Sequence, residues 1–357
     1  MSNSNTLILD PAPGEVRAGL FDQDGTALAL YVDRASERTR HAAAGALYCG
    51  RVRAVEASLN AAFVDLGVGP PGFLPLGKAR GNTSIFEGAA IIVRLRREAF
   101  AEKGPLLMLD TAPGDDARHP CPSLIAPAPD FVHRINAKEA NVREATREDR
   151  ETLDAVFEAA LSPLVRLPGG GEVMIEPTRA LVAVDVDTAS DTRRALEVNI
   201  EAIEMVFRHL AMRGLAGIIA IDFAPMKGAK ERKKLNTALM EAVAAQHGRI
   251  EAEPLNRFGV AVLTLQRRHR PIAEIMLDDK GNPLTETVAL SALRCAQNEH
   301  RAQPAKAITV YAHDTVIDWL NAHKDDWAAP LLSHLGGRLS LEAKPAFNID
   351  QFEVIAQ

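Results

Sequence analysis

Cysteine is scarce in this sequence, and the three residues present, Cys49, Cys121 and Cys295, lie far apart. No CxxC pair occurs, which argues against both a disulfide framework and a thiolate zinc site. No uninterrupted apolar run approaches the length that spans a bilayer, so no membrane partner is expected. The N-terminus lacks a basic segment followed by an apolar one, so we expect no secretory signal and predict a cytoplasmic protein.

The sequence also lacks a net positive charge, since its net charge is −6. Phosphate binding depends on local clusters of Lys and Arg rather than on the sum, and two such clusters occur, Lys227 to Lys234 and Gln266 to Arg270. A charge run is usually only a solvated helix face, so neither cluster decides a function alone. The 357 residues suffice for two or three domains.

Hydrophobic patterning divides the chain into segments of different character. Residues 6–32 predict a β-hairpin, and the short strands with Gly/Pro turns over 45–110 predict a small closed barrel such as an OB-fold. We expect a loop or linker over 111–130 and one or two helices over 137–161. Strands near 179–187, 217–223 and 260–265, separated by helices near 192–212 and 230–246, predict a largely parallel sheet. The tail from 285 to 357 predicts a small α+β domain.

Acidic residues end two successive strands of this α/β segment. Asp185 ends one and Asp222 ends the next, so in a βαβ unit both carboxylates lie at the same edge of the sheet. If their oxygens approached to ~4 Å, the repulsion would be about 4 kcal/mol at an effective dielectric near 20, which favours a shared proton or a divalent cation. Asp187 points to the same face and adds a third oxygen, a set that suits magnesium or manganese better than zinc. A single aspartate at a strand end is more often a helix cap or turn former.

Longer stretches of the sequence resemble the RNase E/G family of endoribonucleases, in order along the chain. The stretches are Tyr48 to Val52, Ala61 to Gly67, Gly72 to Leu76, Arg166 to Asp187, Val198 to Ala202, Gly214 to Phe223, Asn256 to Gly259 and Leu265 to Arg267.

The resemblance implies a multidomain α/β and β fold. Its expected parts are an RNase H-like hairpin piece (1–40), an inserted S1-type OB-fold barrel that binds RNA (41–110), a shortened connecting or sensor-like region (111–165), a DNase I-like metal-dependent catalytic domain (166–280) and a small C-terminal domain (281–357).

The resemblance also implies a reaction and its residues. Asp185 and Asp222 are expected to be catalytic and to ligate Mg²⁺ (or Mn²⁺), with Asp187, where the family has asparagine, as a further ligand. The metal-bound water then hydrolyses single-stranded RNA, such as rRNA precursors, tRNA precursors or mRNA, and leaves a 5′-phosphate. The expected RNA-binding residues are Tyr48, Arg51, Phe63, Phe73, Lys103, Lys227, Lys230, Arg257 and Arg267.

Two departures from the family pattern bear on partners and specificity. The family's cysteine-containing zinc link should fall between Arg270 and Leu284, and this stretch has no cysteine, so we expect no zinc and any homodimer must use other contacts. Residues 111–165 are too few for a complete 5′-end sensor, so a preference for 5′-monophosphorylated RNA is not expected. These losses motivate an alternative, a degenerate relative that binds RNA or the ribosome without cutting. A third hypothesis, a phosphohydrolase of small substrates, leaves the barrel without a purpose.

Overall fold

The structure is a computed structural model that describes residues 5–77, 85–99, 103–110, 119–135, 140–246, 250–267, 269–335 and 337–357. Parts of the predicted linker (111–118) and of the predicted helical segment (137–139), together with Arg268, lie outside these residues. The chain divides into two compact units, one of residues 1–10, 18–31 and 141–275, and one of residues 11–17, 32–140 and 276–357.

The predicted N-terminal hairpin is present and forms part of a four-stranded sheet of order β10-β1-β2-β3. Its strands are β1 (Thr6–Ala12), β2 (Glu15–Phe21), β3 (Ala27–Arg34) and β10 (Asn141–Glu144). Gly14 has a φ of 79° in the two-residue turn between β1 and β2, a conformation that favours glycine. Strand β10 corrects the helix predicted there, because residues 141–144 pair in parallel with β1.

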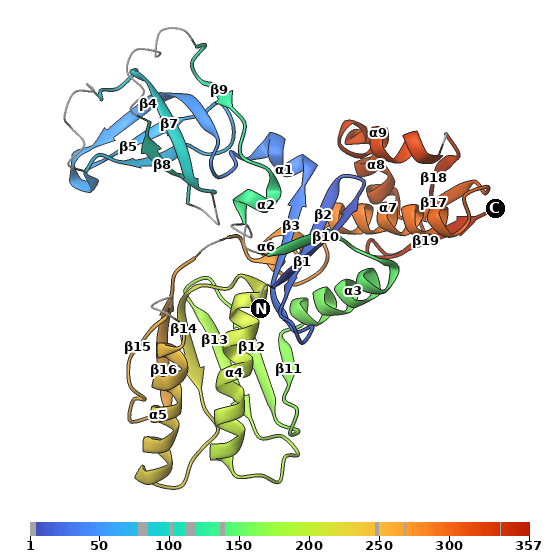
Figure 1. The fold of residues 1–357 in the computed structure, drawn as a ribbon. Helices are drawn as coiled ribbons and strands as arrows, with labels where there is room; N and C mark the ends of the chain where they lie inside the picture. The colour runs from blue at the N-terminus through green and yellow to red at the C-terminus, as the bar shows by residue number, and fades with distance from the viewer. Residues whose placement is uncertain are drawn as a thin grey trace. The chain divides into compact units, whose positions relative to one another are not determined.

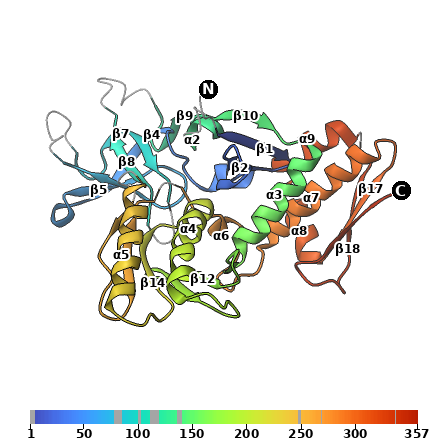
Figure 2. The same cartoon turned by 60° about the horizontal axis from the view of Figure 1, so that its bottom comes forward.

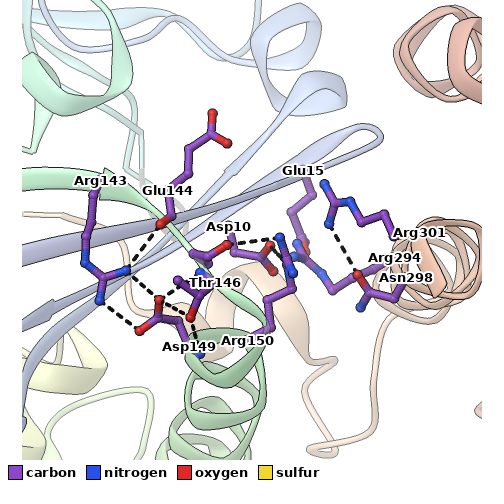
Figure 3. A network of polar contacts seen from close by, with 11 residues as sticks. Asp10, Glu15, Arg143, Glu144, Thr146, Asp149, Arg150, Arg294, Asn298 and Arg301 are labelled. Carbon is purple, nitrogen blue, oxygen red and sulfur yellow. Dashed lines mark hydrogen bonds and ion pairs between the residues drawn. The ribbon is translucent and has the colours of Figure 1, made fainter.

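A helix does begin directly after β10, at α3 (Arg147–Leu161). Thr146 and Asp149 form a reciprocal capping box at its N-terminus, where each side chain bonds the other residue's backbone N–H. Arg143 and Arg150 extend this polar network to Asp149 and Asp10, with Arg150 Nε donating to Asp10 Oδ1 over 3.2 Å (Figure 3). The network joins the start of α3 to strands β1 and β10.

The predicted barrel closes through five strands in the order β5-β6-β8-β7-β4, with β4 pairing back to β5, and is consistent with an OB-fold. Its strands are β4 (Leu47–Glu56), β5 (Ala61–Asp65), β6 (Gly72–Pro75), β7 (Ala90–Arg97) and β8 (Leu106–Leu109), with the short helix η1 (Ala57–Leu59) after β4. Strand β9 (Ser123–Ala126) pairs with β4, so the segment predicted as loop or linker contains a strand. Helices α1 (Ala35–Arg40) and α2 (Phe131–Arg134) lie before and after the barrel in the sequence.

A six-stranded sheet of order β11-β12-β13-β14-β16-β15 carries the two strand-terminal aspartates. Its strands are β11 (Leu164–Arg166), β12 (Glu172–Pro177), β13 (Val182–Asp187), β14 (Gly217–Asp222), β15 (Ile250–Ala252) and β16 (Val260–Leu265). Only the β13–β14 pair is parallel, and the other four pairs are antiparallel, so the expectation of a largely parallel sheet is wrong.

Helices α4 (Ala195–Arg213) and α5 (Ala229–Ala244) pack on one face of this sheet, as Figures 1 and 2 show. Every second residue of β13, beginning at Val182, is buried in a core with Val198, Leu210 and Leu235. The alternate residues of β13 and β14 point to the uncovered face, where Asp185 and Asp222 are exposed. Helix α4 ends at Gly214, whose φ of 73° supplies the left-handed cap.

The tail forms the predicted α+β domain around a three-stranded sheet of order β18-β17-β19. Helix α6 (Ile272–Met276) precedes the domain in the sequence. The elements of the domain are α7 (Thr285–Ala302), β17 (Ile308–Ala312), α8 (Asp314–Ala322), α9 (Lys324–Leu335), β18 (Leu339–Ala343) and β19 (Phe352–Ala356). Glu15 is buried and accepts bonds from Arg17 (2.8 Å), Arg34 (2.9 Å) and Arg294 (3.0 Å). Figure 3 labels Glu15 and Arg294 of this set. Burial alone would raise the pKa of Glu15, but the three guanidinium charges lower it to about 2.

Candidate active site

The central feature of the candidate site is a pair of aspartates on adjacent parallel strands. Asp185 and Asp222 are register partners at the carboxyl ends of β13 and β14. Adjacent strands lie about 4.8 Å apart, so the two side chains leave the same face side by side. Both are exposed, and among the residues that the structure describes neither carboxylate has a hydrogen bond or ion pair. Four carboxylate oxygens open to solvent therefore stand at one edge of the sheet.

The third acidic residue, Asp187, has a different local role. It lies exposed on the same face of β13, and its Oδ1 accepts a bond from the backbone N–H of Ala189 over 2.8 Å. Across the described ranges, the structure has no cluster of three or more His, Cys, Asp or Glu side chains able to enclose a metal ion. The geometry therefore does not support Asp187 as a third ligand beside the pair. Magnesium is commonly held by one or two carboxylates, with waters and substrate phosphate completing its octahedron, so the pair alone fits it.

Positive side chains lie close in sequence to Asp222. The segment after β14 carries Lys227 and then α5, which begins at Ala229 with Lys230 in its first turn, and both lysines are exposed. The N-cap residue of α5 is Gly228, with a φ of 108°. Because glycine has no side chain, it supplies no capping hydrogen bond to the first N–H groups of the helix. Lysine charge and a helix N-terminus both favour an anion such as phosphate.

The segment that follows Asp222 is held by a buried asparagine of α4. Asn199 is fully buried, its Nδ2 donates to the carbonyl oxygen of Ala224 over 2.9 Å, and its Oδ1 accepts from the N–H of Ala224 over 3.0 Å. Both backbone groups of a residue two positions after Asp222 are thus satisfied by one side chain. Asn199 stands in the sequence only as part of a family-like stretch, and no local pattern indicates this bidentate contact.

A structured turn precedes β16 at the same edge. The Oδ1 of Asn256 accepts from the N–H groups of Phe258 (2.9 Å) and Val260 (3.1 Å), and Gly259 has a φ of 89°. Val260 is the register partner of Asp222, so this turn adjoins the aspartate pair. Arg257 is exposed and lies over the ring of Phe258, with 4.7 Å from Cζ to the ring centroid. Farther along, Arg267 is paired with Glu274 at 3.5 Å.

The barrel presents two aromatic rings on its outer surface. Phe63 and Phe73 are register partners on β5 and β6, and their half-buried rings meet edge to face at a centroid distance of 5.9 Å. Lys103 is exposed and precedes β8, whose Leu106 pairs with Phe73. This arrangement places two aromatic side chains on neighbouring strands and a cationic one three residues before a third strand.

Two other barrel residues expected to contact RNA have structural surroundings. Tyr48 is 6% exposed and belongs to the barrel core, and burial raises the pKa of its hydroxyl. Its ring therefore fills the barrel interior, which corrects its assignment to the RNA-binding surface. Arg51 is exposed but donates to the carbonyl oxygens of Gly88 and Cys121, each over 3.0 Å, and so also ties two loops to β4.

Comparison with known proteins identifies the family to which the chain belongs. Residues 78–268, more than half of the chain, match the Ribonuclease E/G family, so the chain belongs to that family of ribonucleases. Ribonuclease E of Haemophilus influenzae is 30% identical over 193 residues, which cover 50% of this chain and 20% of that protein. Ribonuclease G of Escherichia coli K12 is 26% identical over 212 residues, covering 56% of this chain and 43% of that protein.

The chain spans less than half the length of these curated relatives. A third, ribonuclease E of Escherichia coli K12, is 34% identical over 128 residues, which cover 34% of this chain and 12% of that protein. No helix in the described part of the chain combines the length and apolar character that a membrane crossing requires.

Proposed function

We propose that this chain is an endoribonuclease that hydrolyses phosphodiester bonds of single-stranded RNA at Asp185 and Asp222. The observation that carries the proposal is the register pairing of these two exposed carboxylates at the ends of β13 and β14. Both strands lie within the residues that match the Ribonuclease E/G family. In the architecture proposed here, this sheet with α4 and α5 is the DNase I-like catalytic domain, the barrel is the S1-type RNA-binding domain, and the N-terminal hairpin is the RNase H-like piece.

Asp185 and Asp222 would hold Mg²⁺, with Mn²⁺ as a substitute. The bound ion supplies a water of lowered pKa and neutralises the charge that develops on the phosphate. The two aspartates contribute the fixed oxygens, and because neither is engaged by another described side chain, both are free to face the ion. The hydrolysis leaves a 5′-phosphate on one product and a 3′-hydroxyl on the other.

Binding of the strand is assigned to the cations and aromatics around these carboxylates and on the barrel. Lys227, Lys230 and Arg257 provide phosphate contacts near the sheet edge, while Phe63 and Phe73 stack bases. Each phosphate contact on a single strand gives a slope of roughly −0.7 in log affinity against log salt. Binding of a labelled oligoribonucleotide should therefore weaken steeply with salt, and a flat response would contradict the assignment.

The test is cleavage of a labelled single-stranded RNA by the wild type, Asp185→Asn and Asp222→Asn, with Mg²⁺, Mn²⁺ or EDTA. Asp279→Asn serves as a matched control, since Asp279 is an exposed acid in a turn of the other compact unit. We expect EDTA to abolish cleavage and each active-site variant to lower it by about 10²-fold or more, with Asp279→Asn unchanged. A 5′-phosphate-dependent exonuclease then identifies the product ends.

A second candidate function is RNA binding without cleavage. It is favoured by the absence of cysteine between Arg270 and Leu284, where the family's zinc link would fall. The same experiment separates the two functions. If nothing is cut although the wild type and Asp222→Asn bind RNA equally, the chain retains the fold and has lost the reaction.

A further inference from the structure

One strongly exposed aromatic residue near the aspartate pair, Phe258, has no part in the proposed metal binding or phosphate contacts. Phe258 is 73% exposed, more than any other large hydrophobic residue in the described chain. A single exposed apolar side chain is ordinary on a protein surface, so exposure alone indicates nothing. What distinguishes Phe258 is how its backbone is held, what covers one side of its ring and what lies next to it.

The backbone around Phe258 is fixed by a dense set of hydrogen bonds. Besides the two bonds to Asn256 Oδ1, the N–H of Gly259 donates to the Asn256 carbonyl over 3.1 Å, and the N–H of Asn256 donates to the Val260 carbonyl over 3.0 Å. Arg232, on α5, donates to the carbonyl of Arg257 over 3.3 Å. The turn therefore presents the ring from a defined position, and little ordering entropy remains to be lost when a ligand binds it.

The guanidinium of Arg257 lies over the Phe258 ring at 4.7 Å. This cation–π contact orients the ring and places a positive charge beside it. Lys227 and Lys230 add two exposed cations in the segment after β14 and in the first turn of α5. Two carboxylates, Glu231 and Glu253, offset part of this positive charge. A flat apolar ring with neighbouring cations matches the two parts of a nucleotide, a base that stacks and a phosphate that is negative.

Phe258 also lies close to the aspartate pair along the sheet. Val260 is the register partner of Asp222, and two residues of extended chain span at most about 7 Å, so the backbone of Phe258 lies no more than about 7 Å from that of the residue paired with Asp222. We propose that Phe258, steadied by Arg257, is the platform on which one unpaired base of the RNA strand stacks next to the bond held at Asp185 and Asp222. This inference rests on the proposed function and adds a base contact on the catalytic sheet to those on the barrel.

The experiment scans an oligoribonucleotide with single abasic sites, which remove one base and keep every phosphate. Binding is measured in the Asp222→Asn background, so that it does not depend on cleavage. At one position, loss of the base should weaken binding about 5- to 150-fold, the range expected for a stacked base. Phe258→Ala should weaken binding of the intact strand by the same factor and should remove the abasic penalty at that position only. Phe258→Tyr should retain both.

Phe347→Ala is the matched control, because Phe347 also lies under a cation, Lys344, at 5.0 Å, but in the C-terminal domain. It should leave affinity and the abasic profile unchanged. If Phe258→Ala binds like the parent, or loses affinity while every abasic penalty persists, the stacking platform is refuted although the proposed function stands. If no variant binds the RNA, both the proposed function and this inference are refuted.

Discussion

Removal of the Asn199 amide tests whether the segment after Asp222 must be held for the site to work. In Asn199→Ala, the N–H and the carbonyl of Ala224 lose their partners at 3.0 Å and 2.9 Å. Ala224 is itself 3% exposed, so water cannot readily replace the amide. Each buried backbone group left unsatisfied costs about 1–3 kcal/mol, so for the two groups we expect a loss of roughly 2–6 kcal/mol in the free energy of unfolding.

The functional consequence should exceed that of equal destabilisation elsewhere. Asn199 acts through Ala224 on the position of Asp222, so it is a positioning residue, and its loss should raise the Mg²⁺ concentration needed for half-maximal cleavage. Leu210→Ala is the control, because Leu210 is buried on the same helix and its truncation costs about 2–5 kcal/mol. Urea unfolding measures the stability of both variants, and cleavage rates over a magnesium titration measure the site.

If Asn199→Ala and Leu210→Ala, compared under conditions where both are folded, show the same dependence on magnesium as the wild type, Asn199 does not position Asp222. Asn199 would then contribute only to stability. Asn199→Asp adds a further comparison, because it keeps the acceptor for the Ala224 N–H and loses the donor to its carbonyl. Because its second carboxylate oxygen would face that carbonyl oxygen in a fully buried site, it should be at least as destabilised as Asn199→Ala in urea unfolding.

Three further predictions concern stability and RNA affinity. Glu15→Gln should destabilise the protein by about 3–5 kcal/mol in urea unfolding at pH 7, because it removes the carboxylate charge that three buried guanidinium groups share. The wild type should lose this contribution as the pH falls from the unfolded pKa near 4.5 through the folded value of about 2. Burial and two neighbouring arginines lower the pKa of His209 to about 4, so the neutral ring is favoured in the fold. The free energy of unfolding should therefore fall by about 3 kcal/mol as the pH drops from 6.5 to 4. The variant His209→Gln should flatten this part of the curve of stability against pH. Phe63→Ala and Phe73→Ala should each weaken binding of single-stranded RNA by about 1–3 kcal/mol in a filter-binding assay, and equal affinity to the wild type would exclude base stacking there.

The strands that could be predicted from the sequence are those whose burial alternates or whose apolar run is long. Strands β4 to β7 and β13, β14 and β16 fall where the pattern placed them, because one face of each is buried. Strand β10 could not be found this way: all four of its residues are exposed, and its polar composition continues that of α3. Its strand conformation depends on pairing with β1, which lies more than a hundred residues away in the chain.

The same distinction separates the predicted site residues from those that were missed. Asp185 and Asp222 could be placed together because a strand–helix–strand unit brings its strand ends to one edge. The orientation of β12 and β16, both antiparallel, was not determined by local pattern, since a strand flanked by loops can pair in either direction. Asn199 and Phe258 were missed because an asparagine in a helix and a phenylalanine in a turn between two strands give no sign of which is buried and which exposed.

The open geometry of the aspartate pair has a consequence for metal binding. Two carboxylates leave most of an octahedral ion's positions to water and phosphate, so the protein alone should bind the ion weakly and the RNA should strengthen binding. Linkage requires that RNA raise the affinity for the ion by the same factor that the ion raises the affinity for RNA. Free Mn²⁺ can be followed by electron paramagnetic resonance, with and without a phosphorothioate oligoribonucleotide that resists cleavage. The variant Asp185→Asn/Asp222→Asn measures the ion held by RNA alone. Equal Mn²⁺ affinity with and without RNA, after that subtraction, would show that phosphate does not complete the site.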